Sequence, residues 1–307
     1  MTEPRPGLNL ASPKGDVLSA AGGIEGRSLW QDARRRLFAN RAAVVSLVLL
    51  AAITVVSIVG PDLTPWSYDQ IDWDHMEANP PDLATRHYFG TDTVGRDLLA
   101  RTLFGGRISL LVGLLATAVA LVIGVGVGAT AGFIGGRTDQ LLMRFVDVMY
   151  AVPLTFFVII LMVLFGRAFI LMFLAIGCVE WLTMARIVRG QTLALKQKEF
   201  IEAARAAGGS NAAIILRHIV PNVLGVVVVY VTLTIPQVIL LESFLSFLGL
   251  GVQEPMTSWG MLISEGASEM EANPRTLIIP AAFLTMTLFC FNFLGDGLRD
   301  ALDPKDR

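Results

Sequence analysis

The sequence predicts an all-α integral membrane protein with six transmembrane helices. Of the 307 residues, 54% are hydrophobic and 16% are charged, whereas soluble domains carry about 25% charged residues. The apolar residues gather in runs of about 20, the length that an α-helix needs to cross a bilayer. Arg and Lys concentrate before the first run, after the fourth and after the sixth. Because basic residues mark cytoplasmic segments, both termini are expected in the cytoplasm.

Composition and motifs also exclude several functions. The net charge of −2 and the lack of a basic tract argue against a nucleic-acid partner. The sequence has no G-x-x-x-x-G-K-[ST] motif to bind a nucleotide, no His/Cys cluster with metal-ligand spacing, and no credible Ser, His and Asp set. We therefore expect no enzymatic activity, cofactor or metal in this chain, and the energy for any transport has to come from another subunit.

Residues 1–40 are predicted to form a cytoplasmic tail that ends in a basic helix. The first part, Met1–Gly26, is rich in Pro, Gly, Ala and Ser and lacks the apolar region of a signal peptide. Ser28–Ala43 then places Trp30 among four arginines, a pattern typical of an amphipathic helix at the membrane surface. The first transmembrane helix is expected over residues 41–60.

Residues 61–106 are expected to form a periplasmic loop, because they hold several Pro and more acidic than basic residues. Within the loop, His87, Asp92 and Asp97 lie near glycines, as they would in a metal or phosphate site. One histidine and scattered aspartates lack the spacing of metal ligands, however. A structured loop that packs on a binding protein or on the helix bundle is therefore the favoured interpretation.

Residues 107–296 are predicted to form a core of five more helices, followed by a cytoplasmic tail over 297–307. The expected spans are Ile108–Ile134, Gln140–Phe165, Ala168–Met184 (continuing to Lys198), Val223–Leu241 and Thr276–Leu294. In the first of these, Ala or Gly recurs every fourth residue from 116 to 132, which predicts a seam for close helix packing. Pro153 should kink the next, where Arg144 and Asp147 can pair.

Two carboxylates are the candidate residues of a translocation path. Glu180 lies inside an apolar span, and an intramembrane carboxylate is costly, so we expect it to face a cavity or a partner helix. Glu242 begins a glycine-rich segment that ends at Gly260. Such a backbone at membrane depth has to be shielded by protein, which predicts a re-entrant or interfacial piece beside the path.

Residues 199–222 form the stretch around which the chain is organised. Glu199–Ala207 is rich in strong helix formers, and Gly208-Gly209 supplies a helix end. Ser210 can cap a second short helix, which Pro221 is expected to end. A polar helix–turn–helix between membrane spans is not needed to cross a bilayer, so we expect it to be held by a partner. An ordinary solvated loop helix is the alternative.

The pattern Glu202-Ala203-Ala204-x-x-x-Gly208 resembles the EAA loop of ABC-importer permeases. The segments His87–Arg101, Glu242–Gly260 and Gly295–Asp300 resemble the peptide and nickel permeases of that family, and the C subunits of oligopeptide permeases most closely. The resemblance implies a type I ABC importer (MetI-like) permease fold with a cytoplasmic coupling helix. The coupling residues that it implies are Glu202, Ala203, Ala204, Ala207, Gly208 and Pro221.

The resemblance further implies the permease subunit of an ATP-driven importer that translocates oligopeptides or dipeptides across the bacterial inner membrane. Its partners would be a second homologous permease subunit, two cytoplasmic ATP-binding subunits, a periplasmic peptide-binding protein and the membrane lipid. Three alternatives stay open at this point: a nickel or metal-chelate permease of the same family, an ion-driven secondary transporter, and a membrane scaffold subunit that passes no solute.

Overall fold

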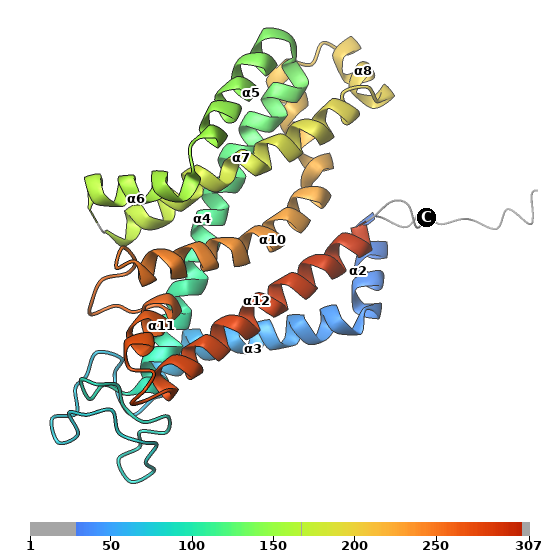
Figure 1. Ribbon diagram of the computed structural model, residues 1–307. Coiled ribbons are helices and arrows are strands. Elements are labelled where there is room, and N and C mark those ends of the chain that lie inside the picture. The colour runs from blue at the N-terminus through green and yellow to red at the C-terminus, as the bar shows by residue number, and fades with distance from the viewer. Residues whose placement is uncertain (1–28, 167, 303–307) are drawn as a thin grey trace, which may run out of the picture.

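The computed structural model describes residues 29–166 and 168–302, so most of the predicted terminal tails lies outside it (Figure 1). In that part of the chain the regular elements are helices, joined by turns and isolated β-bridges. Five helices are long and apolar enough to cross a membrane, and a bent pair makes a sixth span if it is counted as one. The five are α3 (Arg41–Leu63), α4 (Leu98–Ile134), α7 (Phe169–Leu195), the continuous helix Asn211–Phe247 and α12 (Arg275–Leu302).

Two ends of the bundle can be distinguished in Figure 1. The loop of residues 64–97 and the short helix α11 (Trp259–Ser268) lie at one end, which we call the loop end. The short helices α2 (Leu29–Ala39) and α8 (Glu199–Ala206) lie at the opposite end, which we call the α8 end. The basic helix α2 packs on α12 and α3.

The third predicted span is broken, not merely kinked. α5 (Gly136–Ala151) and α6 (Leu154–Phe165) meet at 84°. The residue before a proline is pushed out of the helical region, and Val152 accordingly has an extended backbone. Pro153 also has no N–H to continue the helix. The predicted pairing within this span is wrong as well, because Asp147 accepts a hydrogen bond from Arg186 of α7 at 2.7 Å.

Helix α4 begins ten residues earlier than the span predicted from Ile108. Asp97 caps it, accepting a hydrogen bond from the backbone N–H of Ala100 at 2.7 Å. The predicted seam of small residues is confirmed, because the five Ala and Gly residues are buried against α7. A Cβ added at Gly124 would lie 2.6 Å from the Cβ of Met184, so the two helix backbones approach closely there.

The seam leads to a prediction of opposite sign at two neighbouring glycines. Gly124→Ala should destabilise the protein by about 1–3 kcal/mol, because the added methyl group overpacks the contact with α7. Gly126→Ala should stabilise it by up to about 1 kcal/mol, because nothing lies within 4 Å and alanine favours the helix. Thermal unfolding of both variants in detergent measures the difference. Equal shifts in Tm would contradict the packing of α4 on α7.

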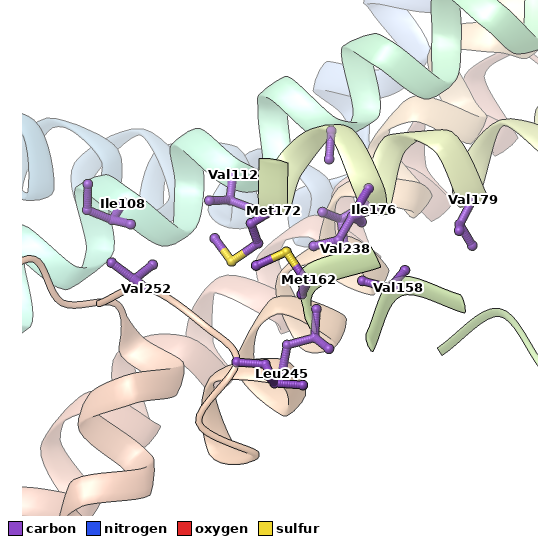
Figure 2. Close-up of a cluster of buried hydrophobic side chains, with 13 residues drawn as sticks. Ile108, Val112, Val158, Met162, Met172, Ile176, Val179, Val238, Leu245 and Val252 are labelled. Atoms are coloured by element: carbon purple, nitrogen blue, oxygen red, sulfur yellow. The ribbon is translucent and has the colours of Figure 1, made fainter. Parts of the chain in front are cut away.

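A hydrophobic core joins four helices in the half of the bundle nearer the loop end (Figure 2). α4 contributes Ile108 and Val112, and α6 contributes Val158 and Met162, which lie against residues of α7 and α10 (Val220–Phe247). These contacts hold α6 against the side of the bundle, although α6 is not continuous with α5.

Buried ion pairs hold the loop end together. Arg101 of α4 is 1% exposed and bonds Asp92 of the loop and Glu265 of α11, the latter at 2.8 Å. Arg96 bonds Asp92 at 2.8 Å and Glu254 at 2.9 Å. These pairs tie the loop, α4 and α11 into one unit, as expected of a structured loop.

The segment around His87 shows the same kind of packing. Its ring stacks on Trp66 and its two nitrogens lie 2.9 Å from Asp97 and 3.3 Å from Asp72. Among the described residues, no group of three or more His, Cys, Asp or Glu could hold a metal ion.

Candidate functional site

The helix–turn–helix predicted from the sequence is present at the α8 end. α8 ends at Ala206, and Gly208 takes a left-handed backbone with φ of 82°. The N–H of Gly209 bonds the carbonyl of Ala204 at 3.1 Å and the N–H of Gly208 bonds that of Arg205 at 2.9 Å. These two bonds form a Schellman motif, which satisfies the last carbonyls of the helix.

Ser210 starts the next helix, as predicted. Its hydroxyl accepts a hydrogen bond from the N–H of Ala213 at 3.3 Å, and α9 (Asn211–Ile214) follows. The turn between α8 and α9 is therefore fixed by local backbone chemistry at both of its ends, which gives α8 a defined direction.

α8 has one buried and one exposed side. Ile201 is fully buried, in a cluster with Phe133 of α4 and with Ile214 and Ile219. Ala204 is half-buried against the same cluster. Arg205 is exposed too, but its guanidinium lies over the ring of Phe133. The other exposed residues, which we call the docking face, are Glu199, Phe200, Glu202, Ala203, Ala206, Ala207 and Gly208.

Four of the six predicted coupling residues therefore share one exposed surface. They are Glu202, Ala203, Ala207 and Gly208. Sequence reasoning missed Phe200, whose side chain is 43% exposed beside them. A large aromatic residue in an otherwise polar short helix was the available signal, because aromatic anchors are common at protein interfaces.

The prediction that Pro221 ends the second short helix is wrong. Helix continues from Asn211 to Phe247, and Pro221 lies exposed in the first turn of α10. The preceding turn, η1 (Ile215–Ile219), is a π-helix in which the N–H of Val220 bonds the carbonyl of Ile215. The wider π turn accommodates the proline, which an ordinary α-helix interior would not. The fifth span thus begins at Asn211, not at Val223.

The ring of Phe133 in α4 lies next to two cations, one from α8 and one from the end of α7. The guanidinium carbon of Arg205 lies 4.8 Å from the ring centre of Phe133, and the ammonium nitrogen of Lys196 lies 6.0 Å from it. Both distances fall within the range of cation–π attraction. Lys196 also donates a hydrogen bond to the carbonyl of Ile134 at 3.5 Å.

A cleft opens between α7, α10 and α12 near the α8 end. Its volume is about 540 Å³, in the range of small-molecule sites. Arg186, Gln191, Tyr230 and Arg299 supply the polar part of its lining. Neither Glu180 nor Glu242 lines it.

The two predicted carboxylates lie in different surroundings. Glu180 is half-buried on α7, and no hydrogen bond or ion pair of its side chain is found within residues 29–166 and 168–302. Glu242 is fully buried and accepts hydrogen bonds from Ser246 at 2.7 Å and from Ser109 of α4 at 3.3 Å. The Ser109 hydroxyl also accepts from the N–H of Trp259 at 3.1 Å.

Glu242 therefore connects α10 to α4 and α11 in a packed site. The expected re-entrant segment is also shorter than predicted, because α10 continues to Phe247 before the chain turns through Gly249 into α11. The glycine-rich turn is shielded as expected, with Gly251 packed directly on Ser246.

A bundle of five or six helices that are long and apolar enough to cross a bilayer, with a short helix exposed on one side at one end, defines an integral membrane protein. The family model described as "binding-protein-dependent transport system inner membrane component" matches residues 124–307. A second model, "N-terminal TM domain of oligopeptide transport permease C", matches residues 28–81. The chain belongs to the family of inner membrane components of binding-protein-dependent transport systems.

Several characterised relatives are similar over most of their length. The oligopeptide transport system permease protein OppC of Escherichia coli K12 is 59% identical over 92% of this chain and 94% of its own. OppC of Haemophilus influenzae is 58% identical over 92% and 91%. The dipeptide transport system permease protein DppC of Bacillus subtilis is 43% identical over 91% and 87%.

Proposed function

We propose that this chain is a membrane-spanning subunit of an ATP-driven importer and that its cargo is peptides. The docking face of α8 is the observation that supports transport driven by ATP. It is exposed, while its reverse side is anchored in the bundle, as a surface that receives force from a partner has to be. The names of the relatives support the cargo, since they are oligopeptide and dipeptide permeases.

The partners in this proposal are a second homologous permease subunit, two cytoplasmic ATP-binding subunits and a periplasmic peptide-binding protein. The α8 end would face the cytoplasm, and the loop end would face the periplasm. The arginines of α2 and the basic residues Arg186, Arg189, Lys196 and Lys198 support this orientation, because they gather at or near the α8 end.

Transport would follow from two states of the assembly with different affinity for ATP. Binding of ATP closes the ATP-binding subunits on each other, and the docked α8 moves with them. Small side chains at Ala203 and Ala207 let the partner backbone approach closely, and Glu202 offers a carboxylate to a basic partner group. In this proposal the partner subunits hydrolyse ATP, and this subunit contributes only the movement of its helices.

The cleft between α7, α10 and α12 is the proposed inner part of the path. Its arginines, Gln191 and Tyr230 offer hydrogen-bond donors to peptide carbonyls and carboxylates, which all peptides share. Glu180 is kept as a path residue. Glu242 can join the path only in a state in which α10 separates from α4 and α11.

Uptake by the reconstituted importer tests the function. Proteoliposomes with all subunits should accumulate a labelled peptide when ATP and the binding protein are present, and dissolving ion gradients with ionophores should leave the rate unchanged. Uptake that follows an ion gradient without ATP would indicate a secondary transporter. Uptake of radioactive nickel but not of peptide would indicate a metal permease. If a stable complex takes up neither peptide nor nickel, the result would indicate a membrane scaffold subunit.

A further inference from the structure

Helix α4 reaches from one end of the bundle to the other without a break. Its 37 residues correspond to about 55 Å of helix. Pro61, Pro236 and Pro280 lie inside α3, α10 and α12, and α10 also follows a π turn. Among the long described helices, α4 and its neighbour α7 contain no proline. α4 is therefore continuous and free of proline kinks, and α7 supports it along its seam of small residues.

At the α8 end, α4 is held by the docking helix itself. Phe133 is 1% exposed, and the charged groups of Arg205 of α8 and of Lys196 at the end of α7 lie 4.8 Å and 6.0 Å from its ring centre. Only the short link from Lys196 to Lys198 joins α8 to α7, so the chain alone would let α8 swing. The contact of Arg205 with the ring and the burial of Ile201 fix the angle between α8 and α4.

At the loop end, α4 is held just as tightly. Asp97 caps the helix and also bonds His87, while Arg101 bonds Asp92 and Glu265. A shift of α4 along or about its axis thus has to move the loop and α11 with it, since separating these buried charges is costly.

We propose that α4 carries the movement of the docking face to the loop end, and that Phe133 is the positioning residue through which α8 grips α4. This inference rests on the proposed function and adds a route to it. ATP closure on one side of the membrane would change the loop and α11 on the other, where cargo is delivered.

A set of matched variants tests this route. Phe133→Leu keeps an apolar side chain of similar bulk but has no ring face for Arg205 and Lys196. Phe133→Tyr keeps the ring face and serves as the rescue. Arg205→Gln removes one cation at an exposed position, where the substitution should leave folding undisturbed. It therefore tests the same contact even if Phe133→Leu fails to fold. Arg205→Lys is its conservative partner.

Two quantities are measured on the complete importer in proteoliposomes. One is the number of peptides imported per ATP hydrolysed, and the other is the hydrogen exchange of residues 92–101 with and without ATP and vanadate. In the wild type and in Phe133→Tyr, ATP should change the rate of hydrogen exchange of residues 92–101. In Phe133→Leu and Arg205→Gln, the peptide-to-ATP ratio should fall about five- to tenfold and the change in exchange should shrink, as expected for loss of a cation–π contact.

Wild-type ratios and exchange in both Phe133→Leu and Arg205→Gln would overturn the inference. If Phe133→Leu only lowered the stability of the chain, less complex would be recovered, but its peptide-to-ATP ratio would match those of the wild type and of Phe133→Tyr. Co-purification of the ATP-binding subunits separates this inference from the proposed function. If the wild-type chain retains no ATP-binding subunits, both the proposed function and the route through α4 fail. If the wild-type chain retains these subunits and imports peptide, but both variants behave as the wild type, only the route through α4 fails.

Discussion

Arg101→Met is expected to lower the free energy of unfolding by about 3–5 kcal/mol, the usual cost of breaking a buried ion pair from one side. Arg101 is 1% exposed and bonds Asp92, which is 6% exposed, and Glu265 of α11. Methionine fills the space but leaves the Asp92 carboxylate buried with Arg96 as its remaining partner. Denaturant or thermal unfolding in detergent, followed by a probe at the loop end, measures the loss.

Arg107→Met is the matched control. Arg107 lies further along α4 and pairs with Asp62, but the two side chains are 31% and 74% exposed. It also donates a hydrogen bond to the backbone carbonyl of Ile58. Exposed pairs contribute about 0–1 kcal/mol, so this variant should unfold close to the wild type. Similar losses in both variants would mean that the buried charges do not hold the loop end together.

The same ion pairs predict a loss of stability in acid. Burial raises the pKa of Asp92, but Arg101, the backbone N–H of Arg96 and the Arg96 side chain outweigh it and hold the pKa below 3.8. A carboxylate whose pKa is lower in the folded state stabilises the fold above its unfolded pKa. This stabilisation should be complete above pH 3.8 and decline as the pH falls through the folded pKa of Asp92. In Asp92→Asn this part of the pH dependence should be missing.

Gly208→Val is expected to abolish coupled transport while the chain still inserts in the membrane. A β-branched residue is strained at φ of 82°, and its side chain would stand on the docking face. Substitution of a residue at the centre of an interface commonly lowers the affinity for the partner by roughly tenfold or more. Glu202→Lys should act in the same direction by reversing the charge that the face offers. Peptide uptake and ATP hydrolysis by the purified complex are the measurements.

Gly136→Val serves as the control for backbone strain. Gly136 also has a left-handed backbone, with φ of 57°, and neither glycine has an atom within 4 Å of an added Cβ. It is the first residue of α5, outside the docking face. This variant should keep most of its uptake per ATP. Equal loss in the two variants would show that strain, and not docking, explains Gly208→Val.

Local chemistry explains which parts of the fold could be predicted from the sequence. The end of α8 before Gly208 and the start of α9 after Ser210 depend on residues within one turn, so the helix–turn–helix was confirmed. The seam of α4 followed from helical periodicity alone. The length of the apolar runs gave the long spans, although the third became a pair of helices at 84°.

Features that depend on distant residues, or on a turn without a sequence signature, could not be predicted. Pro221 does not end a helix because the π turn before it widens the backbone, and no local pattern announced that turn. Arg101 and Glu265 are 164 residues apart in sequence. The contact of Phe133 with Arg205 and the serines around Glu242 likewise unite elements that the sequence separates widely.

Photocrosslinking from Ala203 and Ala207 in the assembled importer tests the central claim most directly. A photoreactive residue at either position should form an adduct with an ATP-binding subunit. The same residue at Leu114, which is 58% exposed in the middle of α4, should form none. Adducts at Ala203 and Ala207 with lipid or water alone, in a complex that holds its ATP-binding subunits, would contradict the account.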